Sequence, residues 1–238
     1  MNKHKVRPIV TVETNSPKII YTYLAGYGET ISANTYSWFI EGPKEKILID
    51  TGAKAEKFHQ LGWPSKESSP EEGLSKFGVT CEDIDLVIVT HLDFDHIELA
   101  HKYPKAKFIV QKKELDSGLN PHPSYKWRYN RSLFEDLDFE IVEGDKEIVA
   151  GVRVLLTPGH SMGTQSVAVE TDRGTEIIAG FCCVRDTFES TENAKEVMAR
   201  MFPIISPGIH VNYMQVYDSV NRIMKEADVI LPLHEAKL

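Results

Sequence analysis

An uninterrupted apolar run, DLVIVT at Asp85–Thr90, constrains the fold of this chain more than any other segment. A half-buried strand alternates apolar and polar residues, whereas a run without alternation is typical of a strand covered on both faces. The run leads directly into His91-Leu92-Asp93-Phe94-Asp95-His96. Imidazole nitrogen and carboxylate oxygen are the ligands expected for zinc, iron or manganese. The sequence therefore predicts a helix-covered sheet with potential metal ligands at the end of one strand.

Strands and helices interleave along the rest of the chain, and hairpins join several of the strands. The predicted strands are Lys18–Leu24, Tyr36–Ile40, Lys46–Ile49, Asp85–Thr90, Lys107–Val110, Asp138–Val142, Gly151–Leu156, Ser166–Glu170, Thr175–Ala179 and Asp228–Leu231. The predicted helices are Ala53–Leu61, Pro70–Phe77, Gln111–Asp116, Thr191–Met201 and Val211–Ala227. This α/β (α+β) pattern favours mixed sheets covered by helices over a purely parallel doubly wound fold.

The segment from Gly118 to Leu137 has no regular pattern and is aromatic, with Trp127 and Tyr129 near its middle. A long irregular loop of this kind is a candidate lid or substrate wall. It is equally a candidate for a surface loop packed by its own side chains.

Three histidines share one setting, because each follows directly after a predicted strand. They are His91, His160 in the turn Thr157-Pro158-Gly159-His160, and His234 in Leu231-Pro232-Leu233-His234. Asp50 also lies at a strand end, in Asp50-Thr51-Gly52. Ligand sites commonly form where strand ends meet. We therefore expect one site at the edge of the sheet.

Composition excludes several classes of protein. The chain has 238 residues, and Lys+Arg 27 against Asp+Glu 35 gives a net charge of −8. An acidic chain without a basic cluster is a poor match for nucleic acid, and the absence of a long apolar run excludes a membrane partner. Three cysteines do not suggest a disulfide framework, and no secretory signal is recognisable. We expect one cytoplasmic domain over residues 1–238.

Taken in order, four motifs resemble the metallo-β-lactamase superfamily: Asp50-Thr51-Gly52, His91-x-Asp93-x-Asp95-His96, Pro158-Gly159-His160 and Pro232-x-His234. The resemblance covers about Tyr36 to His234. It implies an αββα sandwich of two mixed β-sheets flanked by helices, with a metal-binding hydrolase site at one edge. The segments HLDFDH, FIVQKKEL, LLTPGHSMGTQSV and IIAGFCC look most like the N-acyl-homoserine-lactone lactonase branch.

The resemblance also implies two sets of metal ligands. One metal would take His91, position 93 and His160, and the other would take Asp95, His96 and His234. The family usually has His where this chain has Asp93. Asp93 can still ligate, and two His with one carboxylate also suit iron or manganese. The expected cofactor is therefore one or two zinc ions, with iron or manganese as alternatives.

Two further positions depart from the family pattern. Phe181 stands where the family usually has the Asp that bridges the two metals, so we expect one tightly held metal and a second that is weak or absent. Cys182 could replace that Asp only if the strand register slips, and a buried apolar Cys is the favoured interpretation. Val184 stands near the position of a Tyr in the lactonase branch. The tyrosines that could replace it are Tyr23, Tyr36, Tyr125, Tyr129, Tyr213 and Tyr217.

These residues predict a metal-dependent hydrolase that opens a lactone or cleaves another small acyl ester. A metal-bound water would be the nucleophile, and Asp50 would accept an imidazole N–H from a ligand. The resemblance implies that Asp95 orients that water or shuttles its proton. A mononuclear iron or manganese site with an oxidative or sensing role is one alternative. A catalytically impaired ligand-binding member is another. The resemblance makes a homodimer an ordinary expectation.

Overall fold

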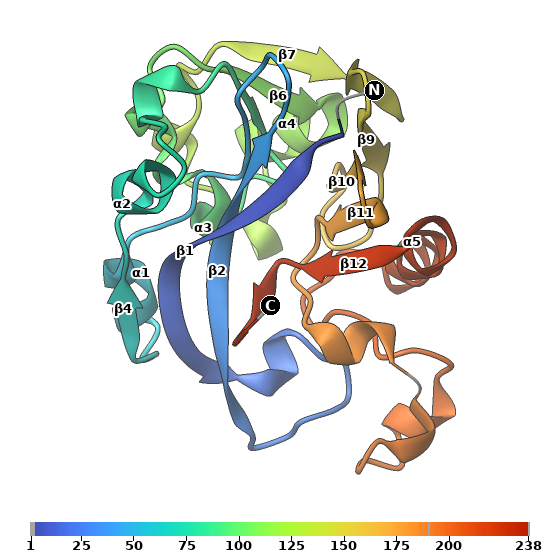
Figure 1. The fold of residues 1–238 in the computed structure, drawn as a ribbon. Coiled ribbons are helices and arrows are strands. Elements are labelled where there is room, and N and C mark those ends of the chain that lie inside the picture. The colour runs from blue at the N-terminus through green and yellow to red at the C-terminus, as the bar shows by residue number, and fades with distance from the viewer. Residues whose placement is uncertain (1–2, 190, 238) are drawn as a thin grey trace.

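Two β-sheets face each other in the computed structural model, which describes residues 3–189 and 191–237 (Figure 1). The first sheet has the order β4-β1-β2-β3-β5-β6-β7, and β13 also pairs with β2. Its strands are β1 (Lys5–Pro17), β2 (Thr30–Glu41), β3 (Ile47–Ile49), β4 (Ser65–Glu67), β5 (Leu86–Ile88), β6 (Lys107–Gln111), β7 (Phe139–Val142) and β13 (His234–Glu235). The second sheet has the order β12-β11-β10-β9-β8. Its strands are β8 (Lys146–Val149), β9 (Val152–Leu156), β10 (Gln165–Thr171), β11 (Gly174–Ala179) and β12 (Val229–Pro232).

Both sheets mix parallel and antiparallel pairs. In the first, β3, β5, β6 and β7 run parallel, while β1 and β2 are antiparallel. In the second, β11 and β12 are parallel, and the predicted hairpin of β10 and β11 is confirmed. Parallel neighbours bring the carboxyl ends of β3 and β5 to the same edge of the sheet.

Apolar side chains fill the space between the sheets and also cover their outer faces. Ile88 of β5 packs in the central cluster with Trp38 of β2 and Val154 of β9. Its neighbours Val87 and Val89 point to the opposite face, in a cluster that contains Leu74 of α2. The DLVIVT run is therefore buried on both faces, as its lack of alternation predicts.

Helices flank the two sheets on opposite sides. The helices are α1 (Ala55–Gln60), α2 (Pro70–Ser75), α3 (Phe94–Ile97), α4 (Lys112–Leu119) and α5 (Tyr213–Glu226). In Figure 1, α1 and α2 lie at the left, beside the first sheet, and α5 lies at the right, beyond β11 and β12. Val220 and Ile223 of α5 pack against Ile177 of β11. The αββα arrangement expected from the sequence is confirmed. Within the described residues, no helix is long and apolar enough to cross a membrane.

Two predicted elements are wrong. The segment predicted as a strand at Lys18–Leu24 is a 3-10 turn, η1 (Lys18–Ile20), followed by bends. The preceding strand β1 already pairs with β2 along its whole length, so the chain must reverse here. The predicted helix Thr191–Met201 is two short 3-10 turns, η7 (Thr191–Asn193) and η8 (Ala199–Met201).

The second error has a physical reason in the surroundings of the segment. Val197, Met198 and Met201 have exposed fractions of 66%, 52% and 71%. A short helix is marginal in water unless an apolar face packs against the protein. These residues have no such surface, so their helical propensity does not determine the structure.

Candidate metal centre

The six side chains expected to bind metal gather at one edge of the sandwich, in two groups of three. The groups are His91, Asp93 and His160, and Asp95, His96 and His234. Within each group the potential ligand atoms lie within 4.8 Å of one another. The rings form a continuous row, with centroids 4.6 Å apart for His160–His91, 4.2 Å for His91–His96 and 5.3 Å for His96–His234.

The loop after β5 is held by its two apolar residues, Leu92 and Phe94. Leu92 is fully buried against the outer face of the first sheet, and Phe94 packs against Phe58 of α1 with ring centroids 5.3 Å apart. With these two side chains turned into the core, the intervening Asp93 and Asp95 are left to face the row of rings.

Asp50 fixes the orientation of His96. Its carboxylate is fully buried and accepts hydrogen bonds from the backbone N–H of Thr90 (2.7 Å) and from the Thr90 hydroxyl (2.7 Å). The same carboxylate lies 2.9 Å from Nδ1 of His96. A carboxylate that accepts from Nδ1 leaves Nε2 free for a metal. The contact expected for Asp50 is therefore confirmed.

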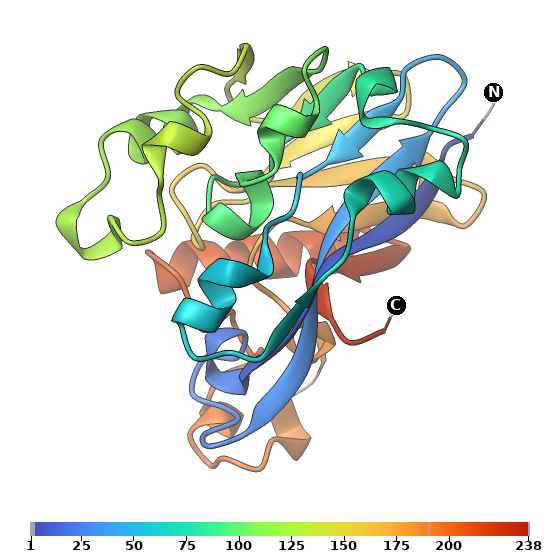
Figure 2. The ribbon, with the colours of Figure 1, turned by 90° about the vertical axis from the view of Figure 1, so that its left-hand side faces the viewer.

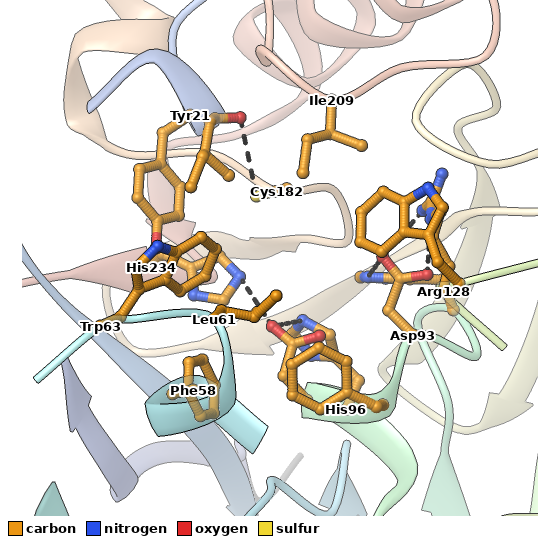
Figure 3. A pocket seen from close by; sticks show the side chains of 15 residues that line it. Tyr21, Phe58, Leu61, Trp63, Asp93, His96, Arg128, Cys182, Ile209 and His234 are labelled. Atoms are coloured by element: carbon orange, nitrogen blue, oxygen red, sulfur yellow. Dashed lines mark hydrogen bonds and ion pairs between the residues drawn. The ribbon is translucent and has the colours of Figure 1, made fainter. Parts of the chain in front are cut away.

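Asp95, His96 and His234 form an open ligand set. Figure 3 labels His96 and His234 of this set at the pocket. Oδ2 of Asp95 lies 3.4 Å from Nε2 of His96 and 3.7 Å from Nε2 of His234. Both Nε2 atoms are buried, and neither has a hydrogen-bond partner among the described residues. Buried polar atoms are normally paired, so two nitrogens that converge on a carboxylate without partners fit a metal ion.

The pKa shifts of the three ligands indicate their protonation states. Burial raises the pKa of Asp95, but His96 and His234 outweigh burial and hold that pKa below its usual value. Burial lowers the pKa of His234 to about 4. Asp95 is thus an ionised carboxylate at neutral pH and His234 a neutral imidazole, which are the forms that bind metals. Burial lowers the pKa of His96, but Asp95 and Asp50 outweigh burial and hold that pKa well above its usual value, so a metal would displace a proton from His96.

The loop that carries His160 is tied to the loop of His91 by Glu114, a residue that the sequence analysis does not single out. Glu114 is fully buried on α4 and accepts from the Leu92 N–H (2.9 Å), the Gly163 N–H (3.2 Å) and the Ser161 hydroxyl. Glu114 lies in the segment FIVQKKEL, but that segment alone does not point to a contact with the site. Its role depends on packing between segments that are far apart along the chain.

Arg128 enters the first group and is a second residue that the sequence analysis misses. Its side chain is fully buried. Nε donates to Oδ1 of Asp93 at 2.7 Å, and Nη2 donates to Oδ2 at 2.8 Å. Nη2 also lies 2.9 Å from Nε2 of His160, whose Nδ1 lies 2.7 Å from the carbonyl oxygen of Ile209. Burial opposes ionisation of Asp93, but Arg128 outweighs burial and holds the pKa of Asp93 well below its usual value.

The two groups therefore differ in their fit to a metal. In the group of Asp95, His96 and His234, the donor atoms are free and converge. In the group of His91, Asp93 and His160, a guanidinium already holds both carboxylate oxygens and one imidazole nitrogen. The group of His91, Asp93 and His160 as it stands does not fit a metal ion.

Sequence comparison identifies the family. A family model described as the metallo-beta-lactamase superfamily matches residues 33–180, well over half of the chain. The chain belongs to the metallo-beta-lactamase superfamily. The match contains Asp50, the HLDFDH loop and His160, so the family resemblance of these motifs is confirmed.

Curated relatives in this superfamily include N-acyl homoserine lactonases. The one from Bacillus cereus is 28% identical over 160 residues, which are 61% of this chain and 62% of the relative. AiiA from Bacillus thuringiensis subsp. kurstaki is 27% identical over 164 residues, 63% of this chain and 64% of the relative. The matched region thus spans less than two thirds of the length of either relative.

Solved structures show the same fold over a longer stretch. A variant of AiiA from B. thuringiensis, with N-decanoyl-L-homoserine bound at the active site, superposes with a TM-score of 0.76 at 22% identity. The superposition covers 99% of this chain and 94% of that chain. The lactonase-type metallo-beta-lactamase fold therefore extends over nearly all of this chain.

Phe181 and Cys182, which follow the end of β11, lie in different surroundings. Phe181 is fully buried with Leu155 and Ile177 behind the second sheet, so it does not face the metal ligands. Cys182 lines the same pocket as Asp95 and His234. Because β11 ends at Ala179, strand alternation no longer sets the direction of residue 182. Cys182 lies outside both ligand groups of the described residues, and burial raises the pKa of its thiol well above the usual value.

A pocket opens over His91, His96 and His234. Its floor contains His91, Asp93, Asp95, His96, Arg128 and His234, and its walls are largely apolar: Ile20, Tyr21, Phe58, Leu61, Trp63, Phe94, Trp127 and Ile209. Tyr21 is the tyrosine on the pocket, and it is not among those expected to replace the one missing at Val184. Its hydroxyl bonds to Ser16 at 2.8 Å, and its ring packs 5.3 Å from that of His234.

Trp127 and Arg128 come from the irregular segment after α4. That segment projects from the sheets at the left of Figure 2. Trp127 lies in a wall of the pocket and Arg128 in its floor, so the segment borders the site as expected.

Proposed function

We propose that this chain is a metal-dependent hydrolase that opens a lactone or cleaves another small acyl ester. One observation carries the proposal. Asp95, His96 and His234 form a converging ligand set with two unpaired buried nitrogens, at the polar floor of an apolar-walled pocket. The lactonase relatives support the lactone as substrate class.

The chain's own residues account for most of the chemistry. Asp95, His96 and His234 would hold the metal, zinc being favoured and iron or manganese being compatible with the same donors. When bound, the metal supplies a water of lowered pKa and a positive charge for the developing oxyanion. Asp95 is the partly exposed ligand, with 16% of its side chain accessible, and it is ionised. It therefore accepts a proton from a reacting water and passes it to the leaving oxygen.

The apolar walls bind the acyl part of the substrate. Phe58, Leu61 and Trp63 line one part of the pocket, and Trp127 and Ile209 line another. A largely apolar wall with a few convergent polar groups is the usual construction of a small-molecule site. A cytoplasmic location and a homodimer stay predictions from the sequence.

The experiment is a hydrolysis panel on the full chain reloaded with zinc, manganese or iron. N-acyl homoserine lactones of increasing acyl length and simple aryl esters are the substrates, and proton release reports ring opening. We expect turnover of lactones, and a loss of at least ~10²-fold in kcat/KM for His234→Ala, since even outer partners of metal ligands contribute 10- to 100-fold. His101→Ala, at an exposed histidine outside the pocket, is the matched control.

Absence of turnover with every metal and substrate, or equal activity in His234→Ala, would contradict the proposal. A second candidate follows from the same ligand set, because two His and one carboxylate also form oxygen-activating iron sites. Iron retained through purification, with oxygen consumption and without hydrolysis, would favour that oxidative role.

A further inference from the structure

The guanidinium of Arg128 lies within the group of His91, Asp93 and His160. Figure 3 shows it beside Asp93. It reaches both oxygens of Asp93 in the fork-to-fork geometry that makes Arg–carboxylate pairs strong. A third donor, Nη1, bonds to the carbonyl oxygen of His160 at 2.8 Å. The side chain is therefore fixed at the site by contacts on several sides.

The tautomer of His160 follows from its two partners. The carbonyl oxygen of Ile209 can only accept, so Nδ1 of His160 carries the proton and donates to it. The guanidinium can only donate, so Nε2 of His160 accepts from Arg128. The lone pair that a metal would need on His160 is thus already engaged.

Among His91, Asp93 and His160, only His91 has a free donor atom. Nε2 of His91 lies 3.6 Å from Oδ2 of Asp93, and its Nδ1 lies 3.0 Å from the Thr90 hydroxyl. A single imidazole does not make a stable site for a divalent ion. In the second group, by contrast, Nε2 of both His96 and His234 lacks a partner among the described residues.

Charge leads to the same conclusion as geometry. Arg is protonated at every accessible pH, so its charge at this position is permanent. It neutralises Asp93, and it repels any cation that approaches the same atoms.

We propose that Arg128 permanently occupies the place of a metal ion among His91, Asp93 and His160. The chain then holds a single metal, on Asp95, His96 and His234. Arg128 is then a positioning residue that keeps Asp93 and His160 in the form they would have around a metal. Its charge balances that of Asp93 whether or not metal is supplied. The inference rests on the proposed function only in assuming that the second group binds metal.

The test counts metal ions per chain, and it does not depend on turnover. The full chain is stripped with chelator, dialysed to equilibrium against zinc and analysed for zinc and protein. We expect one ion per chain in the parent protein, one in His91→Ala and none in His234→Ala. Two ions in the parent, with loss of one in His91→Ala, would overturn the inference.

Arg128→Met tests the residue itself, because methionine keeps a long side chain but removes the charge and the donors. We expect two ions per chain in this variant, since Asp93 and His160 become available. Arg131→Met, at an exposed residue three positions along the same segment, is the matched control and should hold one ion. A folded Arg128→Met protein that still holds one ion would overturn the role of Arg128.

Arg128→Met also leaves Asp93 buried without a partner, and the variant could fail to fold for that reason. The parent protein, His91→Ala and His234→Ala then still decide the question. Failure of this inference is distinct from failure of the proposed function. Two ions with lactone turnover contradict only the inference, whereas no bound metal and no turnover contradict both.

Discussion

Asp50 is a residue whose effect on the site is transmitted wholly through another side chain. It accepts from Nδ1 of His96 and is itself fixed by two hydrogen bonds from Thr90. Asp50 also has a positive φ of 55°, which is uncommon for a residue other than glycine. Strained backbone persists where the surroundings determine it strongly, and here it aims a carboxylate at a ligand.

Asp50→Asn should therefore weaken metal binding without removing a ligand. We expect a 10- to 100-fold loss of zinc affinity, since an amide cannot replace a carboxylate that accepts from three donors. Competition with a fluorescent chelator measures this affinity. Asp85→Asn, at an exposed carboxylate just before the neighbouring strand β5, is the control. Equal affinities of Asp50→Asn and the parent would show that Asp50 does not orient His96.

Residue-level prediction succeeded where ligands follow strand ends in short motifs. His91, Asp93, Asp95, His96, His160 and His234 were grouped from sequence, and the structure brings them together. Arg128, Glu114 and Tyr21 were not found. Arg128 and Tyr21 belong to no motif, and the segment FIVQKKEL gives Glu114 no role by itself. Each reaches the site only because segments distant in sequence pack together.

At the scale of elements, the loop between β9 and β10 is shaped by contact with α5. The N–H of Val211 bonds to the carbonyl oxygen of Gly159 at 2.7 Å, and the Ser219 hydroxyl bonds to that of Pro158 at 2.8 Å. Gly159 has a φ of +126°, and a Cβ built there would lie 2.2 Å from the backbone nitrogen of Val216. Only glycine fits between His160 and the start of α5.

Gly159→Ala should accordingly destabilise the fold. Backbone strain and overpacking each cost roughly 1–3 kcal/mol, so we expect a loss of about 2–6 kcal/mol in the free energy of unfolding. Urea denaturation measures this loss. Gly62→Ala is the control, because Gly62 has a similar positive φ of +79° but nothing within 4 Å of the built Cβ. A loss no larger than that of Gly62→Ala would mean that the contact with α5 is not tight.

Elements were predictable where local pattern and tertiary environment agree. The run DLVIVT and the hairpin of β10 and β11 are strands in both sequence and structure. Lys18–Leu24 and Thr191–Met201 were predicted from propensity, and there the surroundings decide otherwise. One lies where the chain turns from β1 into β2. In the other, Val197, Met198 and Met201 stay exposed and only a small cluster around Ala199 is buried, too little to hold a helix.

At the scale of the whole molecule, the site exists because two sheets with different strand orders end at one edge. The first sheet supplies Asp50 and the loop after β5, and the second supplies the loop after β9 and the turn after β12. His234 belongs to both, since it follows β12 and pairs with Thr35 of β2. The fold was predictable from the order of the four motifs. The position of Arg128 among His91, Asp93 and His160 was not.

The charge balance of the assembled site favours one metal. At an effective dielectric constant of ~20, two unit charges roughly 4 Å apart interact by about 4 kcal/mol. A divalent ion at that distance from the Arg128 guanidinium would be repelled by about twice as much. Beside the ionised Asp95 and the neutral His234, a cation would displace only a proton from His96, whose pKa burial lowers but Asp95 and Asp50 hold well above its usual value.

The most direct measurement is an anomalous difference map, collected at the zinc edge from crystals of the zinc-loaded protein. It should contain one peak per chain, bounded by Asp95, His96 and His234, with the guanidinium of Arg128 still on Asp93. A second peak among His91, Asp93 and His160, or no peak at Asp95, His96 and His234, would contradict this account.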